Sequence, residues 1–452
     1  MKIHFIAIGG AVMHNMAIAM FKKGYKVTGS DDEIFEPAKS RLEKYGLLPK
    51  EMGWDVSKIN SAIDSIILGM HAREDNPELI KAKELGLKIY SFPEYLYEQS
   101  KNKTRVVIGG SHGKTTVTAM ILHVLSKCGK EFDYMVGAQL DGFDTMVKIT
   151  DSAPITILEG DEYLTSPIDR RPKFHLYKPD IALVTGIAWD HINVFPTFEI
   201  YKSQFKTFGE LISKDGYLIY CKEDQVLSEV VQSVENKIKK IPYGLPFYKI
   251  ENGKTYLMDG YKKIELNVFG KHNLLNINGA RNVCNCLGIN DKEFYNAISS
   301  FPGAAKRLEL VRKNDKTSMF KDFAHSPSKL KATTDAVKEQ YPDRKLVACM
   351  ELHTFSSLNK NFLDQYKGTM DNADEAFVYF SPHTVEHKKL EFISENEIFK
   401  AFKNPNVKVF TDSKILLDNL LNKNWENSNL LMMSSGNFDG IDFNELADKI
   451  VQ

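Results

Sequence analysis

The sequence predicts an α/β protein built from three domains, each a largely parallel sheet covered by helices. The chain has 452 residues, which is enough for about three domains of ordinary size. Short apolar, β-branched runs alternate with helical patterns along its length, which is typical of parallel sheets. Paired glycines follow two of these runs, at the points where helices are expected to begin. The expected domain boundaries are residues 1–101, 102–302 and 303–452.

The first domain begins with the outline of a dinucleotide-binding unit. A buried strand at residues 3–8 leads through a pair of glycines into a helix at residues 11–23, and a second strand at 25–29 ends in an acidic turn. Strand, glycine turn, helix, strand and acid in this order predict a Rossmann-like domain, although the later glycines of the full fingerprint are missing. A purely structural turn is the alternative. The predicted substrate-binding residues are Gly9, Gly10, Ser30, Asp31 and His71.

The central domain is organised around a glycine loop between a strand at residues 105–108 and a helix at residues 116–125. Backbone N–H groups of such a loop and the helix N-terminus bind phosphate, Lys114 adds a positive charge, and Thr115 offers a hydroxyl to Mg²⁺. Ile108 replaces the first glycine of the full pattern, so an ordinary strand, turn and helix is the alternative. This loop predicts a P-loop ATPase-type domain. The predicted ATP-binding residues of the loop are Gly110, Ser111, His112, Gly113, Lys114, Thr115 and Thr116.

Two further strands of the central domain end in groups that bind cations or phosphate. Glu159 follows residues 154–158, and Asp190-His191 follows residues 180–185. The carboxyl ends of parallel strands meet at one edge of a sheet, so these groups are expected near the glycine loop. Mg²⁺ prefers oxygen ligands, which makes Glu159 the first candidate ligand. His191 read alone is more typical of a core histidine or a hydrogen-bond partner.

The last domain repeats the alternation of strands and helices, which predicts a C-terminal Rossmann-like α/β domain. A Pro302-Gly303 breaker suits a hinge before it. Asp322 and His325 follow its first strand. Earlier in the chain, Asn273 and Asn276 lie three apart and therefore share one helical face, where two carboxamides can bind a nucleotide. A capped, solvent-facing first turn is the alternative.

The composition limits the classes of partner. Lys+Arg and Asp+Glu are equal at 59, so no net basic field recruits nucleic acid or an anionic membrane. The five cysteines are scattered, without a zinc spacing, which favours a reducing compartment. No apolar run approaches the ~20 residues that span a bilayer, and the N-terminus lacks a signal-peptide cleavage site. We expect a cytoplasmic protein that does not insert into membranes.

The motifs occur in one order along the whole chain and resemble those of the Mur ligase family, ATP-dependent enzymes that form amide bonds in peptidoglycan synthesis. Ser326 departs from the family pattern, which has a second histidine there. The resemblance rests on Gly110-Ser-His-Gly-Lys-Thr-Thr116, Glu159-Gly-Asp-Glu162, Asp190-His191, Gly270-Lys-His-Asn-Leu-Leu-Asn276, Lys306-Arg307-Leu-Glu309 and Lys321-Asp322-Phe-Ala-His325-Ser-Pro327.

The resemblance implies roles for these residues. Lys114 would contact the γ-phosphate of ATP, Thr115 and Glu159 would hold one Mg²⁺, and His191 would help to hold a second. Asn273 and Asn276 would face the nucleotide, and Arg307 and Asp322 would close on it from the last domain. A substrate carboxylate would become an acyl phosphate, and an amine would then displace phosphate, with His325 or Asp322 as the proton acceptor. The predicted catalytic residues are Lys114, His191, Arg307, Asp322 and His325.

Two branches of the family resemble the opening of the chain. One joins L-alanine to UDP-N-acetylmuramate, and the other attaches the tripeptide L-alanyl-γ-D-glutamyl-meso-diaminopimelate to the same acid. Residues 162–174 and 434–440 favour the tripeptide branch, whereas residues 351–357 fit neither branch closely. Two other classes stay open at this point. The first domain alone suggests an NAD-dependent oxidoreductase, and the glycine loop alone also suits a regulator that binds ATP as a structural ligand.

Overall fold

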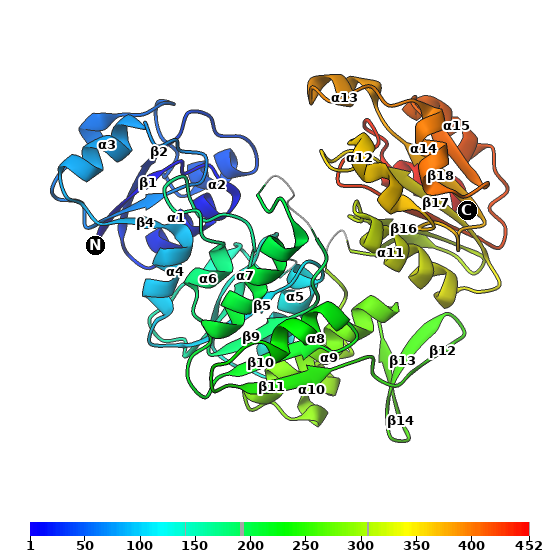
Figure 1. Cartoon of the computed structure of the whole chain (residues 1–452), viewed down its shortest axis with the longest axis horizontal. Coiled ribbons are helices and arrows are strands. Elements are labelled where there is room, and N and C mark those ends of the chain that lie inside the picture. Colours follow the sequence, from blue (N-terminus) through cyan, green and yellow to red (C-terminus); the bar gives the residue numbers. More distant parts are fainter. Residues whose placement is uncertain (141, 190–193, 305–306, 452) are drawn as a thin grey trace. The chain divides into compact units, whose positions relative to one another are not determined.

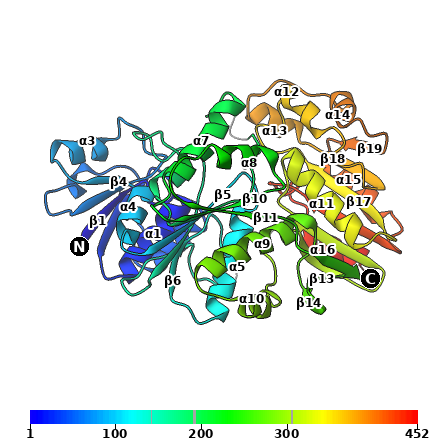
Figure 2. The same cartoon turned by 60° about the horizontal axis from the view of Figure 1, so that its bottom comes forward.

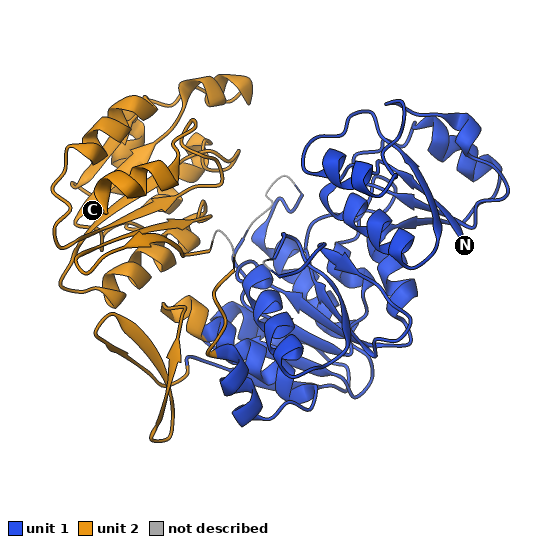
Figure 3. Ribbon diagram, turned by 180° about the vertical axis from the view of Figure 1, so that it is seen from behind, with its two compact units in different colours: residues 1–245, 275–298 blue, residues 246–274, 299–452 orange. Residues whose placement is uncertain are grey.

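Figure 1 shows the computed structural model of the chain, which describes residues 1–140, 142–189, 194–304 and 307–451. It confirms the α/β fold class, with helices covering largely parallel sheets. The chain divides into two compact units: unit 1 holds residues 1–245 and 275–298, and unit 2 holds residues 246–274 and 299–452 (Figure 3). Among the described residues no helix is long and apolar enough to span a membrane.

The N-terminal part of the chain forms a four-stranded parallel sheet in the order β2-β1-β3-β4. All residues of β3 and all but the first of β1 are buried, as expected where helices cover both faces of a parallel sheet. Gly24 follows α1 with a φ of +89°, the conformation that commonly ends a helix. The elements are β1 (Lys2–Ile6), α1 (Ala11–Lys22), β2 (Lys26–Ser30), α2 (Ala38–Lys44), β3 (Ser65–Leu68), α3 (Pro77–Glu84), β4 (Ile89–Ser91) and α4 (Phe92–Ser100).

The next sheet has seven strands in the order β11-β10-β9-β5-β8-β6-β7, all parallel except β7. Its middle strand, β5, lies between β8 and β9, so three carboxyl ends meet at one edge. Helices α5 and α10 pack together beside this sheet (Figure 2). The elements are β5 (Thr104–Gly109), α5 (Lys114–Lys127), β6 (Phe132–Met135), β7 (Val147–Lys148), β8 (Ile155–Glu159), α6 (Lys173–Leu176), β9 (Ile181–Val184), α7 (Phe198–Glu210), β10 (Tyr217–Cys221), α8 (Gln225–Gln232), β11 (Lys239–Tyr243), α9 (Lys271–Cys286) and α10 (Asp291–Ile298).

The sequence analysis did not predict a small antiparallel sheet in unit 2, formed by β12 (Tyr248–Glu251), β13 (Lys254–Asp259) and β14 (Lys262–Leu266). The turn between β12 and β13 is Asn252-Gly253, and both residues have positive φ values of 53° and 69°. Asn-Gly between two short strands is the strongest local signal for a hairpin. This signal was present in the sequence and could have identified the sheet.

A six-stranded sheet in the order β15-β16-β20-β17-β18-β19 completes unit 2, and only the edge strand β15 is antiparallel. Buried apolar side chains pack on both of its faces. The elements are β15 (Glu309–Lys313), β16 (Thr317–Asp322), α11 (Pro327–Gln340), β17 (Lys345–Glu351), α12 (Lys360–Leu363), β18 (Glu375–Tyr379), α13 (Pro382–His387), α14 (Glu395–Phe402), β19 (Val407–Phe410), α15 (Ser413–Leu421), β20 (Ser428–Met433) and α16 (Phe443–Ile450).

Candidate active site

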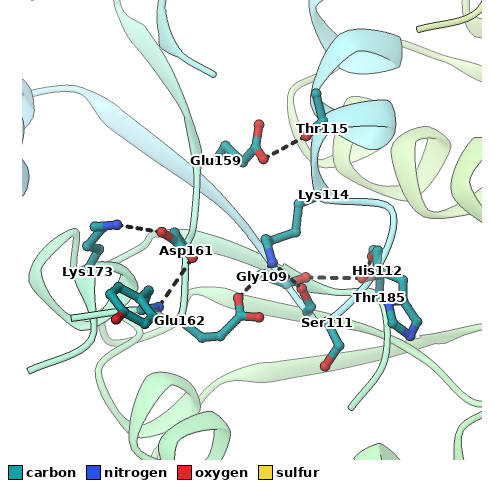
Figure 4. A network of polar contacts seen from close by, with 12 residues as sticks. Gly109, Ser111, His112, Lys114, Thr115, Glu159, Asp161, Glu162, Lys173 and Thr185 are labelled. Atoms are coloured by element: carbon teal, nitrogen blue, oxygen red, sulfur yellow. Dashed lines mark hydrogen bonds and ion pairs between the residues drawn. The ribbon is translucent and has the colours of Figure 1, made fainter. Parts of the chain in front are cut away.

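The glycine loop lies between the carboxyl end of β5 and the start of α5, as the sequence predicted (Figure 4). Gly110 and Gly113 have φ values of +122° and +76°, in the region that favours glycine. The N–H of Ser111 donates to the carbonyl of Gly186 at 3.0 Å. The Thr185 hydroxyl donates to the carbonyl of His112. Contacts from the end of β9 thus fix a loop at the N-terminus of a 14-residue helix, which is an arrangement suited to phosphate.

Lys114 extends from the first turn of α5 toward a buried carboxylate (Figure 4). Its Nζ donates to the carbonyl of Gly110 at 2.8 Å and to Oε2 of Glu162 at 2.7 Å. Burial opposes the charged ammonium, but the carboxylates of Glu162, Asp161 and Glu159 outweigh it and raise the pKa of Lys114. The side chain is therefore a fixed positive charge, as a group that contacts a triphosphate must be.

Glu159 ends β8 beside the loop and is buried. Its Oε1 accepts the hydroxyl of Thr115 at 2.8 Å, and its Oε2 accepts the N–H of Gly137 at 2.8 Å. Burial raises the pKa of Glu159, although both hydrogen bonds and Lys114 act in the opposite direction. A carboxylate and a hydroxyl side by side are the oxygen donors that suit Mg²⁺, which completes its shell with water and phosphate oxygens. The structure thus brings together two of the three predicted metal ligands, while His191 lies outside the described residues.

The two asparagines of α9 are both buried. Asn273 donates from Nδ2 to the carbonyl of Phe269 at 2.9 Å, so this side chain stabilises the start of its own helix. Asn276 packs against the glycine loop, because a Cβ placed on Gly113 would lie 2.5 Å from Oδ1 of Asn276. Asn276 therefore lies beside the glycine loop. The nucleotide contacts of Asn273 and Asn276 stay predictions.

This close approach makes Gly113 a test of the loop. We expect Gly113→Ala to weaken ATP binding at least tenfold, because the Cβ has no room and the φ of +76° is strained for alanine. Gly129→Ala is the matched control, since Gly129 has a φ of +65° and nothing within 4 Å of its added Cβ. Calorimetric titration with ATP and Mg²⁺ measures both variants. Equal affinities would show that the loop does not need glycine here.

The N-terminal sheet brings four of its five predicted binding residues together. The N–H of Gly9 donates to Oδ2 of Asp31 at 2.6 Å, and Ser30 precedes this carboxylate at the end of β2. Burial raises the pKa of Asp31 to about 6. Gly10 precedes α1, and its carbonyl accepts a hydrogen bond from the backbone N–H of His14. His71 is exposed in the loop after β3, and within the described part of the chain no hydrogen bond or ion pair joins it to the other four.

In unit 2 the end of β16 carries the predicted catalytic residues of the last domain. Asp322 accepts N–H groups of Leu308 at 2.5 Å and of Ala324 at 2.6 Å, one on each oxygen. Burial raises the pKa of Asp322 against these hydrogen bonds. The Nδ1 of His325 lies 2.8 Å from the carbonyl of Phe323, so this nitrogen carries the proton of the neutral ring.

Arg307 and Ser326 lie close to these two residues in the chain. The guanidinium of Arg307 stacks 5.0 Å from the ring centre of Phe323, a cation–π contact that holds the side chain in place. The buried hydroxyl oxygen of Ser326 has no hydrogen-bond partner among the described residues. The predicted approach of Arg307 and Asp322 to a nucleotide stays a prediction.

Two residues near the glycine loop, Glu162 and Tyr201, were not assigned a role in the sequence analysis. Glu162 stood inside a motif but was assigned no contact, and Tyr201 belonged to no motif. Tyr201 lies on α7, is fully buried and contacts both Ser111 and Glu162. Ninety positions separate it from Ser111, and nothing in its local sequence distinguishes it from a core tyrosine.

Comparison with protein families covers most of the chain. Residues 2–104 match the model described as "Mur ligase family, catalytic domain", residues 108–284 match "Mur ligase middle domain", and residues 306–436 match "Mur ligase, glutamate ligase domain". A UDP-N-acetylmuramate–L-alanine ligase of Clostridium kluyveri is 30% identical over 439 residues, which is 93% of each chain.

Solved structures share the fold across the chain. A murein peptide ligase from Psychrobacter arcticus superposes with a TM-score of 0.63 at 22% identity, covering 100% of this chain and 99% of its own. A UDP-N-acetylmuramate–alanine ligase from Thermotoga maritima gives 0.68 at 21% identity, covering 97% and 96%. At these identities the superpositions establish the fold.

Proposed function

The chain belongs to the Mur ligase family of ATP-dependent, amide-forming ligases of peptidoglycan, and on this premise we propose that it joins L-alanyl-γ-D-glutamyl-meso-diaminopimelate to UDP-N-acetylmuramate. Because the family consists of ATP-dependent ligases, its assignment rules out the two other classes considered from the sequence, an NAD-dependent oxidoreductase and a regulator that binds ATP as a structural ligand. One observation gives the main support for the ATP-dependent step. The ammonium of Lys114, at the start of α5, is held in place with its Nζ 2.7 Å from Oε2 of the buried Glu162. The choice of acceptor rests on residues 162–174 and 434–440, which resemble the tripeptide branch.

The proposed chemistry has two steps. An oxygen of the muramyl carboxylate attacks the γ-phosphorus of ATP, and ADP leaves. The acceptor amine then attacks the acyl carbon, and inorganic phosphate leaves with the former carboxylate oxygen. A free carboxylate is a poor acyl donor because its leaving group would be oxide, so the first step supplies a better one. Lys114 stabilises negative charge on the transferring phosphoryl group in a site largely removed from water.

We propose that Thr115 and Glu159 hold Mg²⁺ in this site. Their oxygens lie 2.8 Å apart, and Mg²⁺ commonly needs only one or two protein oxygens beside those of phosphate and water. Bound there, the ion would neutralise phosphate charge. A second ion near His191 follows from the family resemblance alone.

The acceptor amine must lose a proton before it attacks. Asp322 has both oxygens engaged by backbone N–H groups, so we assign it the task of shaping the segment around Leu308 and Ala324. His325 donates from Nδ1 to a carbonyl, which makes Nε2 the basic nitrogen of its neutral ring. We therefore propose His325 as the proton acceptor. Wild-type turnover in His325→Ala would remove it from this role.

The L-alanine ligase is the second candidate, because the curated relatives that match at 30% identity over 93% of the chain carry that name. We expect phosphate release in the presence of ATP, Mg²⁺, UDP-N-acetylmuramate and tripeptide, with a kcat/KM at least 100-fold above that for L-alanine. A colorimetric phosphate assay and mass spectrometry of the ligated product measure both. Release with L-alanine alone would assign the second candidate, and release with neither acceptor would contradict the proposed function.

A further inference from the structure

A chain of buried hydrogen bonds lies beneath the glycine loop and ends at Lys114. The hydroxyl oxygen of Tyr201 is 2.8 Å from Oγ of Ser111 and 3.1 Å from Oε1 of Glu162. The other oxygen of Glu162, Oε2, accepts Lys114 at 2.7 Å. Tyr201 is 0% exposed, and Glu162 is 1% exposed. Three separate segments, the loop, the stretch after β8 and helix α7, thus share one polar network.

Elementary chemistry fixes the direction of every bond in this chain. The carboxylate of Glu162 only accepts, so the single hydroxyl proton of Tyr201 points to it. The Ser111 hydroxyl therefore donates to Tyr201, and its oxygen accepts the N–H of Ala188 at 2.8 Å. The order is Ala188 N–H, Ser111 O–H, Tyr201 O–H, Glu162 carboxylate and Lys114 ammonium. Ser111 and Tyr201 each donate and accept, the Glu162 carboxylate accepts from both sides, and the two ends, Ala188 N–H and Lys114, donate.

We propose that Tyr201 is a positioning residue for the phosphate loop: its hydroxyl ties Ser111 to Glu162 and so holds Lys114 in the place where it meets ATP. This inference rests on the proposed ATP-binding role of the loop. Because Glu162 presents separate oxygens to Tyr201 and Lys114, the loss of one partner lets the carboxylate turn and moves the other. When a buried carboxylate loses a hydrogen-bond donor, the free-energy cost of its desolvation is no longer offset, and this cost exceeds the net contribution of an ordinary hydrogen bond to stability.

The test removes one oxygen atom. In Tyr201→Phe we expect the Kd for ATP, measured calorimetrically with Mg²⁺, to rise about tenfold or more. The KM for ATP should rise with it, while the KM for UDP-N-acetylmuramate stays near the wild-type value. Tyr177→Phe is the matched control, because Tyr177 is also 0% exposed and its hydroxyl has no hydrogen-bond partner within the described part of the chain. The control should bind ATP as the wild type does.

A double-mutant cycle with Ser111→Ala separates a relay from two independent contacts. If Tyr201 acts through the chain, the combined variant should lose much less affinity than the sum of the two single losses. Wild-type ATP affinity in Tyr201→Phe, or strict additivity in the cycle, would overturn the inference. Equal loss of affinity in Tyr177→Phe would also overturn it, since any deleted hydroxyl would then have the same effect. Absence of ATP binding by the wild-type protein would instead contradict the proposed function itself.

Discussion

Lys114→Met should lower turnover by about 1,000-fold or more, because the variant keeps an unbranched side chain only one heavy atom shorter and removes the positive charge from the phosphate loop. Lys114 is the only lysine or arginine within the loop of residues 109–115. The backbone N–H groups of the loop remain, so nucleotide binding should weaken less than catalysis. A phosphate-release assay at saturating ATP, together with calorimetric ATP titration, distinguishes the two effects. Near-normal turnover would remove the loop from the mechanism.

The same substitution leaves Glu162 buried without its cation, so loss of folding must be separated from loss of chemistry. Breaking a buried ion pair by removing one partner is costly, whereas replacing both partners is often nearly neutral. Lys114→Met combined with Glu162→Gln should therefore recover much of any lost thermal stability and remain inactive. Lys127→Met is the matched control, because Lys127 is an exposed residue in the last turn of the same helix. The control should retain wild-type turnover and melting temperature.

Local patterns predicted most of the fold and the centre of the site. The alternation of buried strands and helices predicted the parallel sheets, since each of these elements is specified by a few neighbouring residues. Lys114, Thr115 and Glu159 became candidate site residues in the same way, because a loop and a strand end carry their own signals, and the structure places Thr115 against Glu159. The β12–β14 sheet, which was not predicted, shows the limit of local patterns. Its strands carry many charged residues, such as Lys262 and Lys263, and the signal of its Asn252-Gly253 turn did not enter the prediction.

Contacts between distant segments were beyond the reach of such patterns. The partner of Glu159 at Gly137 lies 22 positions away, and the partner of Glu162 at Tyr201 lies 39 positions away. Neither partner belongs to a motif, because a glycine N–H and a tyrosine hydroxyl become important only when the sheet brings them there. The hydrogen bonds of Asp322 were unpredictable for the same reason. The sequence offered it as a proton acceptor, and only the fold shows that two backbone N–H groups occupy its oxygens.

Glu159→Gln should lower kcat by about 100-fold at a fixed Mg²⁺ concentration and raise the Mg²⁺ concentration needed for half-maximal rate. The physical reason is charge, because glutamine keeps the size of the side chain. Its carbonyl can accept the N–H of Gly137, and its amide can donate to the hydroxyl of Thr115 after that hydroxyl rotates. The fold around β8 is therefore expected to remain intact, with a melting temperature close to that of the wild type.

The dependence of rate on Mg²⁺ decides whether Glu159 acts as a metal ligand or only as a structural partner of the loop. A ligand lost from the site shifts the Mg²⁺ titration, whereas a structural change lowers the rate at every Mg²⁺ concentration. Glu229→Gln is the matched control, since Glu229 is exposed on α8. Chelation of Mg²⁺ should abolish turnover in the wild type and the control alike. An unshifted Mg²⁺ titration in Glu159→Gln would leave Thr115 and phosphate oxygens to hold the ion, and would restrict Glu159 to its hydrogen bonds with Thr115 and Gly137.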